Sequence, residues 1–455
     1  MFLVDYNKLD LRRNSTFSQS PGKTRRIVLQ GNDYIIGIPD EAKNRAAGIC
    51  LNTEHGYFTL NSDDFSTGTL AVGATGCGKT TLFFNLLDRI IPFMTSKDVM
   101  LIFDSKGDYK NRYYQYNNPN HIVISLSEKD KDIAKSWSVF GELIDSNNRF
   151  GPDTELIAGE ISKALFKEME SNTQPFFHLS SAQIFEKLLS TFVRDAARTG
   201  DLSKLKNEEL YKFMSSMSNQ DLLELTGKYN DYKFLQNYVG DGSSTQALGV
   251  YGFLSAMLSR NFVSSFRNKQ KAGDFSIRRL IREKGGKVIF LEYDINYSET
   301  LSSIYSLFYD LAIKEALSGK DTNSNTYFIC DEMNLIPYVT KFEELLNFGR
   351  SKGCKTLIGL QSISQLKKNY GEDEADAILA GFLTAICFNS VDPATRKYIK
   401  ERFGETFEVY NFGGSNITRE GYTVSDVDIH NLKVGEAFID MKGVPPFKTR
   451  FIKGA

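Results

Sequence analysis

Cysteine is scarce in this sequence, and its distribution excludes two common structural roles. The cysteines are scattered, without a CxxC spacing, at Cys50, Cys77, Cys330, Cys354 and Cys387. A disulfide framework and a structural zinc site both depend on paired, closely spaced cysteines, so the sequence predicts neither. The same usage is typical of a protein that works in the reducing cytoplasm.

Long hydrophobic runs are also missing. The apolar stretches, such as TLAVGA at 69–74 and KVIFL at 287–291, are far shorter than the ~20 residues of a membrane-spanning helix. The opening residues, MFLVDYNKLDLRRNSTF, become charged after a short apolar start, unlike a signal peptide. We therefore expect a soluble, cytoplasmic protein without a membrane span of its own.

The sequence has no large excess of charge of either sign, and it has few histidines. The formal net charge is −1, and the 4 histidines lie in no metal-ligand spacing. A nearly neutral chain gives no overall signal for nucleic acid, although a motor can confine its basic groups to a pore. Composition therefore leaves DNA binding open.

One segment carries a complete phosphate-binding motif. GATGCGKT, residues 73–80, matches GxxxxGK[ST] between the strand pattern TLAV and the helical pattern TTLFFNLLDRIIPFM. The backbone N–H groups of such a loop bind phosphate, its lysine reaches the β- and γ-phosphates, and its hydroxyl ligates Mg²⁺. The sequence therefore predicts a site for ATP and Mg²⁺, with Lys79 on the phosphates and Thr80 on the metal. The predicted nucleotide-binding residues are Gly73, Ala74, Thr75, Gly76, Cys77, Gly78, Lys79, Thr80 and Thr81.

Three apolar strand patterns end in carboxylates that could complete a magnesium site. These are Asp104 after VMLIF, Asp294 after VIFLEY, and the pair Asp331 and Glu332 after TYFIC. Only the last offers two adjacent carboxylates, one for Mg²⁺ and one to polarise the attacking water. We therefore assign Asp331 to Mg²⁺ and Glu332 as the catalytic base. The alternative is a solvated acid pair at a strand end, and the role of Asp104 stays open.

Two further polar residues are candidates for the site. Gln361 ends the strand pattern KTLIGLQS, and strand ends in open α/β sheets face the ligand crevice, where an amide could sense the γ-phosphate. Arg350, in FGRSKG, is either an ordinary solvated arginine or a group that reaches the nucleotide of a neighbouring subunit. An ordinary polar strand terminus is the alternative for Gln361.

The pattern of predicted elements changes twice along the chain. Strand–loop–helix alternation with continuous apolar runs such as DVMLIFD indicates a sheet that helices cover on both faces. We predict an α/β nucleotide-binding domain at 66–150 and 275–455. An all-α domain at 151–274 interrupts it, and a strand-rich segment at 1–65 precedes it.

The order of these motifs resembles that of the TraG/TraD-type coupling proteins of conjugation and type IV secretion, which are P-loop ATPases of the FtsK/HerA superfamily. The similar segments are the loop, LIFDSKGDY, SWSVFGEL, DEMNLIPYV, FGRSKGCKTLIGLQS, NSVDPATRKYI and DIHNLKVGEAFI. The resemblance covers about 66–455 and implies a RecA-like P-loop NTPase domain with an inserted all-helical domain. The chain departs from the family in lacking membrane-spanning helices and in carrying Ser105, Asp108 and Cys77 where proline, glutamate and serine are usual.

The resemblance also implies roles and partners. It places Arg350 on the nucleotide of the adjacent subunit and makes Gln361 a sensor, so that the catalytic set is Lys79, Glu332, Arg350 and Gln361. It implies an ATP-driven DNA translocase that works as a homo-hexamer and contacts the phosphate backbone of DNA in a central pore. A relaxase or secretion-channel proteins would be further partners and could recruit the protein to the inner face of the cell membrane.

Two other functions remain open. A soluble HerA-like DNA motor in DNA processing or defence would act with a nuclease rather than a relaxase. An ATP-binding adaptor that recruits protein substrates to a secretion channel would show little dependence on DNA.

Overall fold

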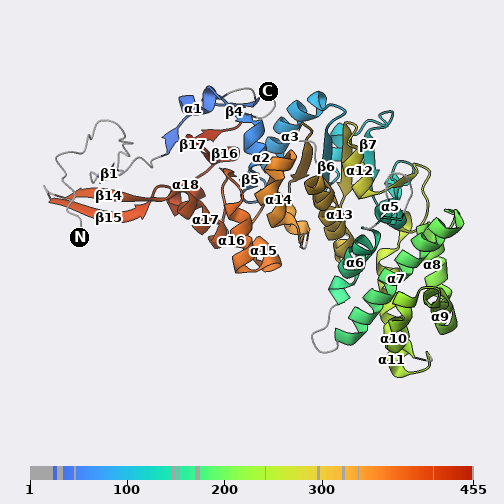
Figure 1. Cartoon of the computed structure of the whole chain (residues 1–455). Helices are drawn as coiled ribbons and strands as arrows, with labels where there is room; N and C mark the ends of the chain where they lie inside the picture. Colours follow the sequence, from blue (N-terminus) through green and yellow to red (C-terminus); the bar gives the residue numbers. More distant parts are fainter. Residues whose placement is uncertain are drawn as a thin grey trace. The chain divides into compact units, whose positions relative to one another are not determined.

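The protein divides into two compact units. The computed structural model describes residues 24–27, 34–45, 48–144, 150–151, 153–169, 175–240, 242–294, 298–319, 323–336, 338–412 and 415–452. The first unit comprises Met1–Phe93, Asp331–Asn334 and Lys355–Ala455, and the second comprises Met94–Cys330 and Leu335–Cys354. Both units combine helices with β-sheet (Figure 1), so the predicted α/β class is confirmed.

A mixed sheet forms the centre of the first unit. In spatial order its strands are β2 (Ile35–Ile36), β17 (Val444–Arg450), β16 (Glu436–Met441), β13 (Thr384–Cys387), β5 (Thr69–Val72) and β12 (Cys354–Leu360). Strands β13, β5 and β12 run parallel, whereas β16 runs antiparallel to both of its neighbours. Every residue of the three parallel strands is buried, as expected for strands covered on both faces.

Smaller sheets and several helices complete the first unit. β3 (Gly48–Thr53) pairs with β4 (Gly56–Asn61), and β14 (Glu405–Phe412) pairs with β15 (Ser415–Tyr422) and β1 (Thr24–Ile27). The described helices are α1 (Asp40–Lys43), α2 (Ser62–Ser66), α3 (Lys79–Ile90), α15 (Ile363–Tyr370), α16 (Glu372–Ala380), α17 (Pro393–Phe403) and α18 (Asp426–His430). Of the predicted segment 1–65, residues 1–23, 28–33 and 46–47 lie outside the described residues, and the rest contains β1 to β4.

Helix α3 follows directly from its sequence pattern. Its buried apolar residues are Leu82, Phe83, Leu86, Leu87 and Ile90, which recur at the spacing of one helix face. This face fixes α3 in the core, so the first turn of the helix has a fixed position at the end of the loop that follows β5.

A parallel sheet forms the centre of the second unit. Its described strands run in the order β11 (Thr326–Cys330), β6 (Val99–Asp104), β10 (Lys287–Glu292) and β7 (His121–Ile124). All residues of β6 are buried. A separate pair, β8 (Ser136–Trp137) and β9 (Asp274–Phe275), is also parallel.

From 154 to 261 the described residues of the second unit form a group of helices with no strand among them (Figure 1). They are α6 (Thr154–Phe166), α7 (Pro175–Thr199), α8 (Asn207–Ser216), α9 (Asn219–Gly227), α10 (Gln236–Val239) and α11 (Thr245–Asn261). Helix α7 packs against α6 and α11 and buries Ile184, Phe185, Leu188 and Leu189 on one face. The exact limits predicted for the all-α domain, 151 and 274, stay a prediction.

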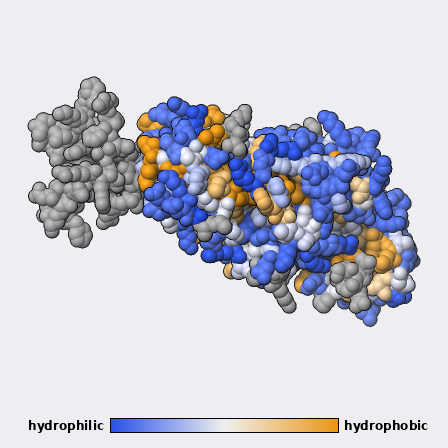
Figure 2. Space-filling view, turned by 90° about the horizontal axis from the view of Figure 1, so that it is seen from above, coloured by the Kyte–Doolittle hydropathy of each residue, from blue (hydrophilic) through white to orange (hydrophobic). Residues whose placement is uncertain are grey.

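The remaining helices of the second unit are α4 (Asp108–Tyr113), α5 (Val139–Leu143), α12 (Ile277–Glu283), α13 (Ser298–Ser318) and α14 (Phe342–Phe348). Within the described part of the chain, no helix combines the length and the apolar composition that a bilayer crossing needs. On the face that Figure 2 shows, hydrophilic residues cover most of the surface around scattered hydrophobic areas.

A buried carboxylate joins α5 to α12 in the second unit. Glu142 is fully buried, and its two oxygens accept hydrogen bonds from the Trp137 indole, the Ser276 hydroxyl and the backbone N–H groups of Ile277 and Arg278, at 2.7–3.2 Å. Four donors satisfy the carboxylate, which offsets the cost of removing it from water. The segment SWSVFGEL therefore has a structural role here.

This network predicts that Glu142→Gln destabilises the second unit. A carboxamide has one acceptor oxygen and turns two N–H donors toward existing donors, so at least two of the four bonds are lost. We expect the free energy of unfolding to fall by about 2–4 kcal/mol, measured by denaturant unfolding. The single tryptophan, Trp137, reports the transition by its fluorescence. The exposed Glu401→Gln is the matched control and should change stability by less than about 0.5 kcal/mol; equal effects of both variants would contradict the argument.

Candidate nucleotide-binding site

The predicted phosphate-binding loop lies between β5 and α3 in the first unit. Gly78 adopts a φ of 118° immediately before the first turn of α3, a conformation that side chains disfavour. It thus turns the chain into the helix, whose first N–H groups have no partner within the helix. A loop of this form is an anion-binding site.

Two neighbouring strand ends hold the loop in place. The backbone N–H of Gly73 donates to the carbonyl of Leu360 at the end of β12 (3.1 Å), and that of Ala74 donates to the carbonyl of Asn389, just after β13 (2.8 Å). On the other side, the backbone N–H of Gly435 donates to the carbonyl of Cys77 (2.9 Å). The loop therefore has a fixed position relative to the carboxyl ends of β12 and β13.

Lys79 is buried and folds back over this loop. Its Nζ donates to the carbonyl oxygens of Gly73 (2.6 Å) and Ala74 (3.1 Å). A phosphate oxygen is a stronger acceptor for an ammonium group than a carbonyl. The side chain is therefore in reach of the position that a bound phosphate would take above the loop.

Thr80 and Asp331 come together although 251 positions separate them in sequence. The Thr80 hydroxyl donates to Oδ2 of Asp331, which follows strand β11, over 2.7 Å, and Asp331 is buried. A hydroxyl and a carboxylate at this distance fit the protein ligands of Mg²⁺ in a P-loop site. The described residues contain no cluster of three or more histidine, cysteine or acidic side chains arranged for a metal. Magnesium held here would therefore take its other ligands from phosphate and water.

Gln361 connects the loop to the second predicted acid. Its Nε2 donates to Oε1 of Glu332 (2.8 Å), and its Oε1 accepts from the hydroxyl of Thr75 in the loop (3.2 Å). The sequence predicted these three residues separately, and the structure places them in one hydrogen-bonded chain. The segment 331–332 lies so close to β12 that a side chain at Gly359 would come within 2.1 Å of the Asp331 carbonyl.

The other predicted residues belong to the second unit. Arg350 is exposed in the short 3-10 helix η8 (Gly349–Lys352), and its role stays a prediction. Asp104, left open from the sequence, ends β6 and is buried, and its Oδ2 accepts from the backbone N–H of Lys110 (2.8 Å). Asp294 follows β10. Asp104 and Asp294 therefore lie at or just after the ends of strands in the sheet of the second unit, whereas Asp331 is the acid that contacts Thr80.

Sequence reasoning missed Asn389 and Glu292. Asn389 lies two positions after the end of the buried strand β13. Its side-chain amide donates to the carbonyls of His430 (2.7 Å) and Leu432 (3.1 Å), which positions its backbone carbonyl for Ala74. The signal was present, because TAICFN ends in a polar residue just as KTLIGLQ does. Glu292 carried the same signal, because KVIFLE also ends in a polar residue, but its position beside Asp104 depends on strand pairing.

Glu292 is a half-buried acid that lines a cavity of about 870 Å³ at the ends of β6, β7 and β10. It pairs in register with Asp104, and burial together with the charge of Asp104 raises the pKa of Glu292 to about 8. Lys110 bridges Glu292 (3.0 Å) and Asp130 (2.7 Å), which partly offsets this rise. The folded protein therefore holds a proton here that the unfolded chain, with the ordinary pKa of 4.5, has lost at neutral pH.

The raised pKa predicts that stability falls as the pH rises between about 4.5 and about 8. In that window the folded state binds more protons than the unfolded state, so each increase in pH favours unfolding. Glu292→Gln should flatten this dependence, so that the difference in unfolding free energy between pH 5 and pH 8 shrinks by roughly 1–3 kcal/mol. Denaturation followed by Trp137 fluorescence measures it. Glu283→Gln, an exposed change on α12, should keep the wild-type slope, and an unchanged slope for Glu292→Gln would contradict the assignment.

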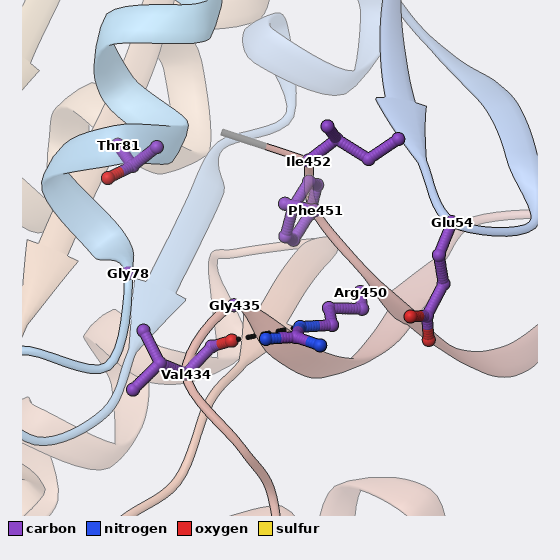
Figure 3. Close-up of a pocket in the computed structure, with 8 residues that line it drawn as sticks. All are labelled: Glu54, Gly78, Thr81, Val434, Gly435, Arg450, Phe451 and Ile452. Atoms are coloured by element: carbon purple, nitrogen blue, oxygen red, sulfur yellow. Dashed lines mark hydrogen bonds between the residues drawn. The ribbon is translucent and has the colours of Figure 1, made fainter. Parts of the chain in front are cut away.

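A second cavity, of about 400 Å³, adjoins the phosphate-binding loop in the first unit. Figure 3 shows Gly78 and Thr81, at the start of α3, across this space from Phe451 and Arg450. The sequence analysis assigned none of the residues on the far side to the site, although Val434 and Gly435 lie in the segment DIHNLKVGEAFI. They come from the segments around positions 54 and 434–452, whose approach to the loop depends on tertiary folding.

Comparison with known proteins identifies the family. A family model described as "Type IV secretion-system coupling protein DNA-binding domain" matches residues 53–428. The chain is 22% identical over 388 residues to the coupling protein TraD of Escherichia coli (strain K12), which covers 82% of this chain and 49% of TraD. It is also 22% identical over 418 residues to the type IV secretion system-coupling protein VirD4 of Bartonella quintana (strain Toulouse). That match covers 86% of this chain and 63% of VirD4.

Solved structures of a coupling protein have the same fold as this chain. The bacterial conjugative coupling protein TrwBΔN70 superposes with a TM-score of 0.73 at 20% identity, over 96% of this chain and 97% of that one. TrwB in complex with ADP and Mg²⁺ gives a TM-score of 0.71 at 19% identity, over 96% of both chains. The predicted RecA-like domain with an inserted all-helical domain is thereby confirmed.

The chain spans from about half to somewhat under two thirds of the length of its two curated relatives. The family model nevertheless covers most of its 455 residues, including the phosphate-binding loop, Asp331, Glu332 and Gln361. The predicted resemblance is confirmed, and the chain belongs to the type IV secretion-system coupling proteins, matching the DNA-binding domain of that family.

Proposed function

We propose that this protein hydrolyses ATP with Mg²⁺ and uses the reaction to move DNA for a type IV secretion or conjugation system. The observation that carries the proposal is the chain Thr75–Gln361–Glu332, because it joins a candidate base to the phosphate-binding loop. The family description names a DNA-binding domain. The relative TrwB has been solved with ADP and Mg²⁺ and with a non-hydrolysable ATP analogue, which supports the choice of nucleotide.

Lys79 and the loop amides would bind the phosphates. The Nζ of Lys79 exchanges its carbonyl partners in the loop for oxygens of the β- and γ-phosphates. Thr80 and Asp331 are the residues that would hold Mg²⁺, either directly or through water. When bound, the metal supplies positive charge that stabilises the negative charge developing on the transferred phosphoryl group.

Glu332 would act as the general base toward the attacking water. Its Oε1 is fixed by the Gln361 amide, so the carboxylate has one defined orientation and its other oxygen can accept a proton from water. The Gln361 carbonyl in turn accepts from Thr75, a residue of the loop itself. A change in the loop when the γ-phosphate leaves would therefore move the base as well.

We further propose that Arg350 completes the site of a neighbouring subunit in a ring, which we expect to be a homo-hexamer. The exposure of Arg350 outside the unit that contains the loop supports a contact in trans. DNA would pass through the ring with contacts mainly to its phosphates. The protein would work in the cytoplasm and be recruited to the secretion machinery by partners such as a relaxase or channel proteins.

The proposal predicts ATP turnover that DNA stimulates. The full chain should hydrolyse ATP severalfold faster with double-stranded DNA than without it. Its affinity for DNA should fall steeply between 50 and 200 mM salt, by about 10³-fold if the protein contacts six phosphates. Glu332→Gln should retain ATP binding but lose about a hundredfold or more in kcat.

A phosphate-release assay and DNA-binding titrations at several salt concentrations measure these quantities. Equal turnover with and without DNA, together with the absence of salt-sensitive DNA binding, would contradict the motor function and favour the adaptor. A DNA-stimulated enzyme that co-purifies with a nuclease would instead favour a motor in DNA processing or defence.

The trans role of Arg350 predicts complementation between inactive variants. Arg350→Ala should bind ATP normally and lose roughly a thousandfold in kcat. Mixing it with Lys79→Ala should restore part of the activity, because some interfaces then combine an intact Lys79 with an intact Arg350.

A mixture of Lys79→Ala with Glu332→Gln is the matched control. Both residues belong to the same unit and the same site, so no mixed interface contains an intact pair and no activity should return. Mass measurement confirms that the subunits have mixed. Recovery in the control, or none in the Arg350 mixture, would contradict the trans role.

A further inference from the structure

We infer that the second unit binds a dianionic phosphate group, either inorganic phosphate or the terminal phosphate of a phosphomonoester. The site is a cavity of about 240 Å³ lined by residues of β7, α5, β9 and α12 and by the first residue of β10. Its cationic side chains are Lys135, Arg279 and Lys287. The inference is independent of nucleotide binding at the phosphate-binding loop, which belongs to the first unit.

Helix α12 divides its arginines between two faces. Arg278 and Arg282 are four positions apart and so share a face, and both guanidinium groups donate to the Glu315 carboxylate of α13 at 2.8–3.0 Å. Arg279 lies on a different face and lines the cavity. Within the described residues its guanidinium group has no hydrogen bond or ion pair. One arginine of α12 is therefore left with all its side-chain donors for a ligand.

Lys135 is a second cation without a partner in the cavity. Its backbone N–H donates to the carbonyl of Val123 in β7 (2.9 Å), which fixes its position. Its half-buried ammonium group has no hydrogen bond or ion pair in the part of the chain that the structure describes. Burial and the charge of Lys287 lower the pKa of Lys135. An anion bound beside both lysines would offset this repulsion.

Two carboxylates in the lining do not neutralise the cluster. Glu283 pairs with Lys287 over 3.4 Å, and its side chain is half-exposed. Asp274 is exposed and forms no ion pair among the described residues, although its charge partly offsets the lowered pKa of Lys135. Water screens exposed charges strongly. Three half-buried cations against two exposed carboxylates leave the cavity positive, so it favours an anion.

The donors of the cavity suit the oxygens of phosphate. A guanidinium group presents parallel N–H donors that match two phosphate oxygens, and an ammonium group adds a point charge. The Ser138 hydroxyl, also in the lining, accepts from the backbone N–H of Gly141 (3.1 Å) and has its own hydrogen left to donate. The volume is below the roughly 300 Å³ at which sites for larger ligands begin. A small anion with several oxygens and two charges therefore fits best.

Backbone hydrogen bonds set the walls of the cavity before any ligand binds. The N–H of Ser136 donates to the carbonyl of Gly273 (2.9 Å), and that of Ser138 donates to the carbonyl of Phe275 (2.8 Å). The Ser276 hydroxyl, at the start of α12, donates to the buried Glu142 carboxylate (2.7 Å). The elements that carry Lys135 and Arg279 are thus joined directly, and little ordering is needed on binding.

Protection of Lys135 from acetylation tests the site. The full chain is treated with N-hydroxysuccinimidyl acetate at increasing concentrations of inorganic phosphate, and acetylation of each lysine is quantified by mass spectrometry. At ten times its Kd, phosphate should slow the acetylation of Lys135 roughly tenfold. The exposed Lys397 of the first unit should keep its rate, and sodium chloride at equal ionic strength should not protect Lys135. Because Lys135 itself is the reporter, phosphate at the nucleotide-binding loop does not affect the result.

A pair of arginine variants provides the matched comparison. Arg279→Gln removes one cation of the cavity and should raise the half-protecting phosphate concentration roughly tenfold. Arg282→Gln removes the same charge from the same helix, but this guanidinium pairs with Glu315, which Arg278 still contacts. It should change that concentration by less than about twofold. Trp137 fluorescence during denaturant unfolding checks that both variants keep the fold.

Further ligands distinguish the two sources of the phosphate group. Glycerol phosphate represents small phosphomonoesters, and a short oligonucleotide with a terminal phosphate or a terminal hydroxyl represents the end of a nucleic acid strand. Protection by inorganic phosphate, alone or with any ligand that carries a terminal phosphate, supports the site and shows which source it accepts. No protection by any phosphate, equal protection by chloride, or equal effects of the two arginine variants would overturn it. Equal protection by both oligonucleotides would overturn it in favour of the internal phosphates of DNA.

Discussion

The hydrogen bonds between the phosphate-binding loop and the ends of β12 and β13 are the constraint on which the rest of the site depends. They join Gly73 to Leu360 and Ala74 to Asn389, so any movement of the loop relative to the sheet would break backbone hydrogen bonds. The buried strands beneath are rigid because they are packed on both faces. A flexible glycine-containing loop thereby acquires a defined geometry toward polar residues from distant parts of the chain.

This constraint explains how single residues can act together. Gln361 is the first residue after β12, and its amide spans from Thr75 in the loop to Glu332. Asp331 reaches Thr80 by the same closeness of strand ends. The groups proposed for the attacking water and the γ-phosphate are thus linked by direct hydrogen bonds, and those proposed for the metal by a separate one. Occupancy of the loop can therefore affect the orientation of the base.

The sequence predicted those residues of the site that belong to a short sequence motif or that follow an apolar strand pattern. The loop motif gave Lys79 and Thr80, and polar residues after buried strands gave Asp331, Glu332 and Gln361, because parallel strands end at one edge of a sheet. The choice of Asp331 over Asp104 agrees with the contact to Thr80, whereas Asp104 accepts a hydrogen bond from the backbone N–H of Lys110 on α4.

Other features depend on pairings that no local pattern records. Glu292 lies beside Asp104 only because β10 pairs with β6. Val434 and Phe451 reach the loop through the hairpin of β16 and β17 and the hydrogen bond between Gly435 and Cys77. A contact of Arg350 in trans would depend on assembly, which a single chain does not encode locally. The fold class was predictable because strand and helix periodicities differ, but the limits of the helical domain follow from packing rather than from composition.

A double-mutant cycle on Glu332 and Gln361 tests the central claim most directly. If Gln361 acts by holding the base, then Glu332→Gln/Gln361→Ala should show the same kcat for ATP hydrolysis as Glu332→Gln alone, because the second change removes support for a group already lost. Gln361→Ala by itself should still lower kcat about tenfold or more. If the two losses instead multiply in the double variant, the residues act independently, and the hydrogen-bonded chain from the loop to the base does not couple them.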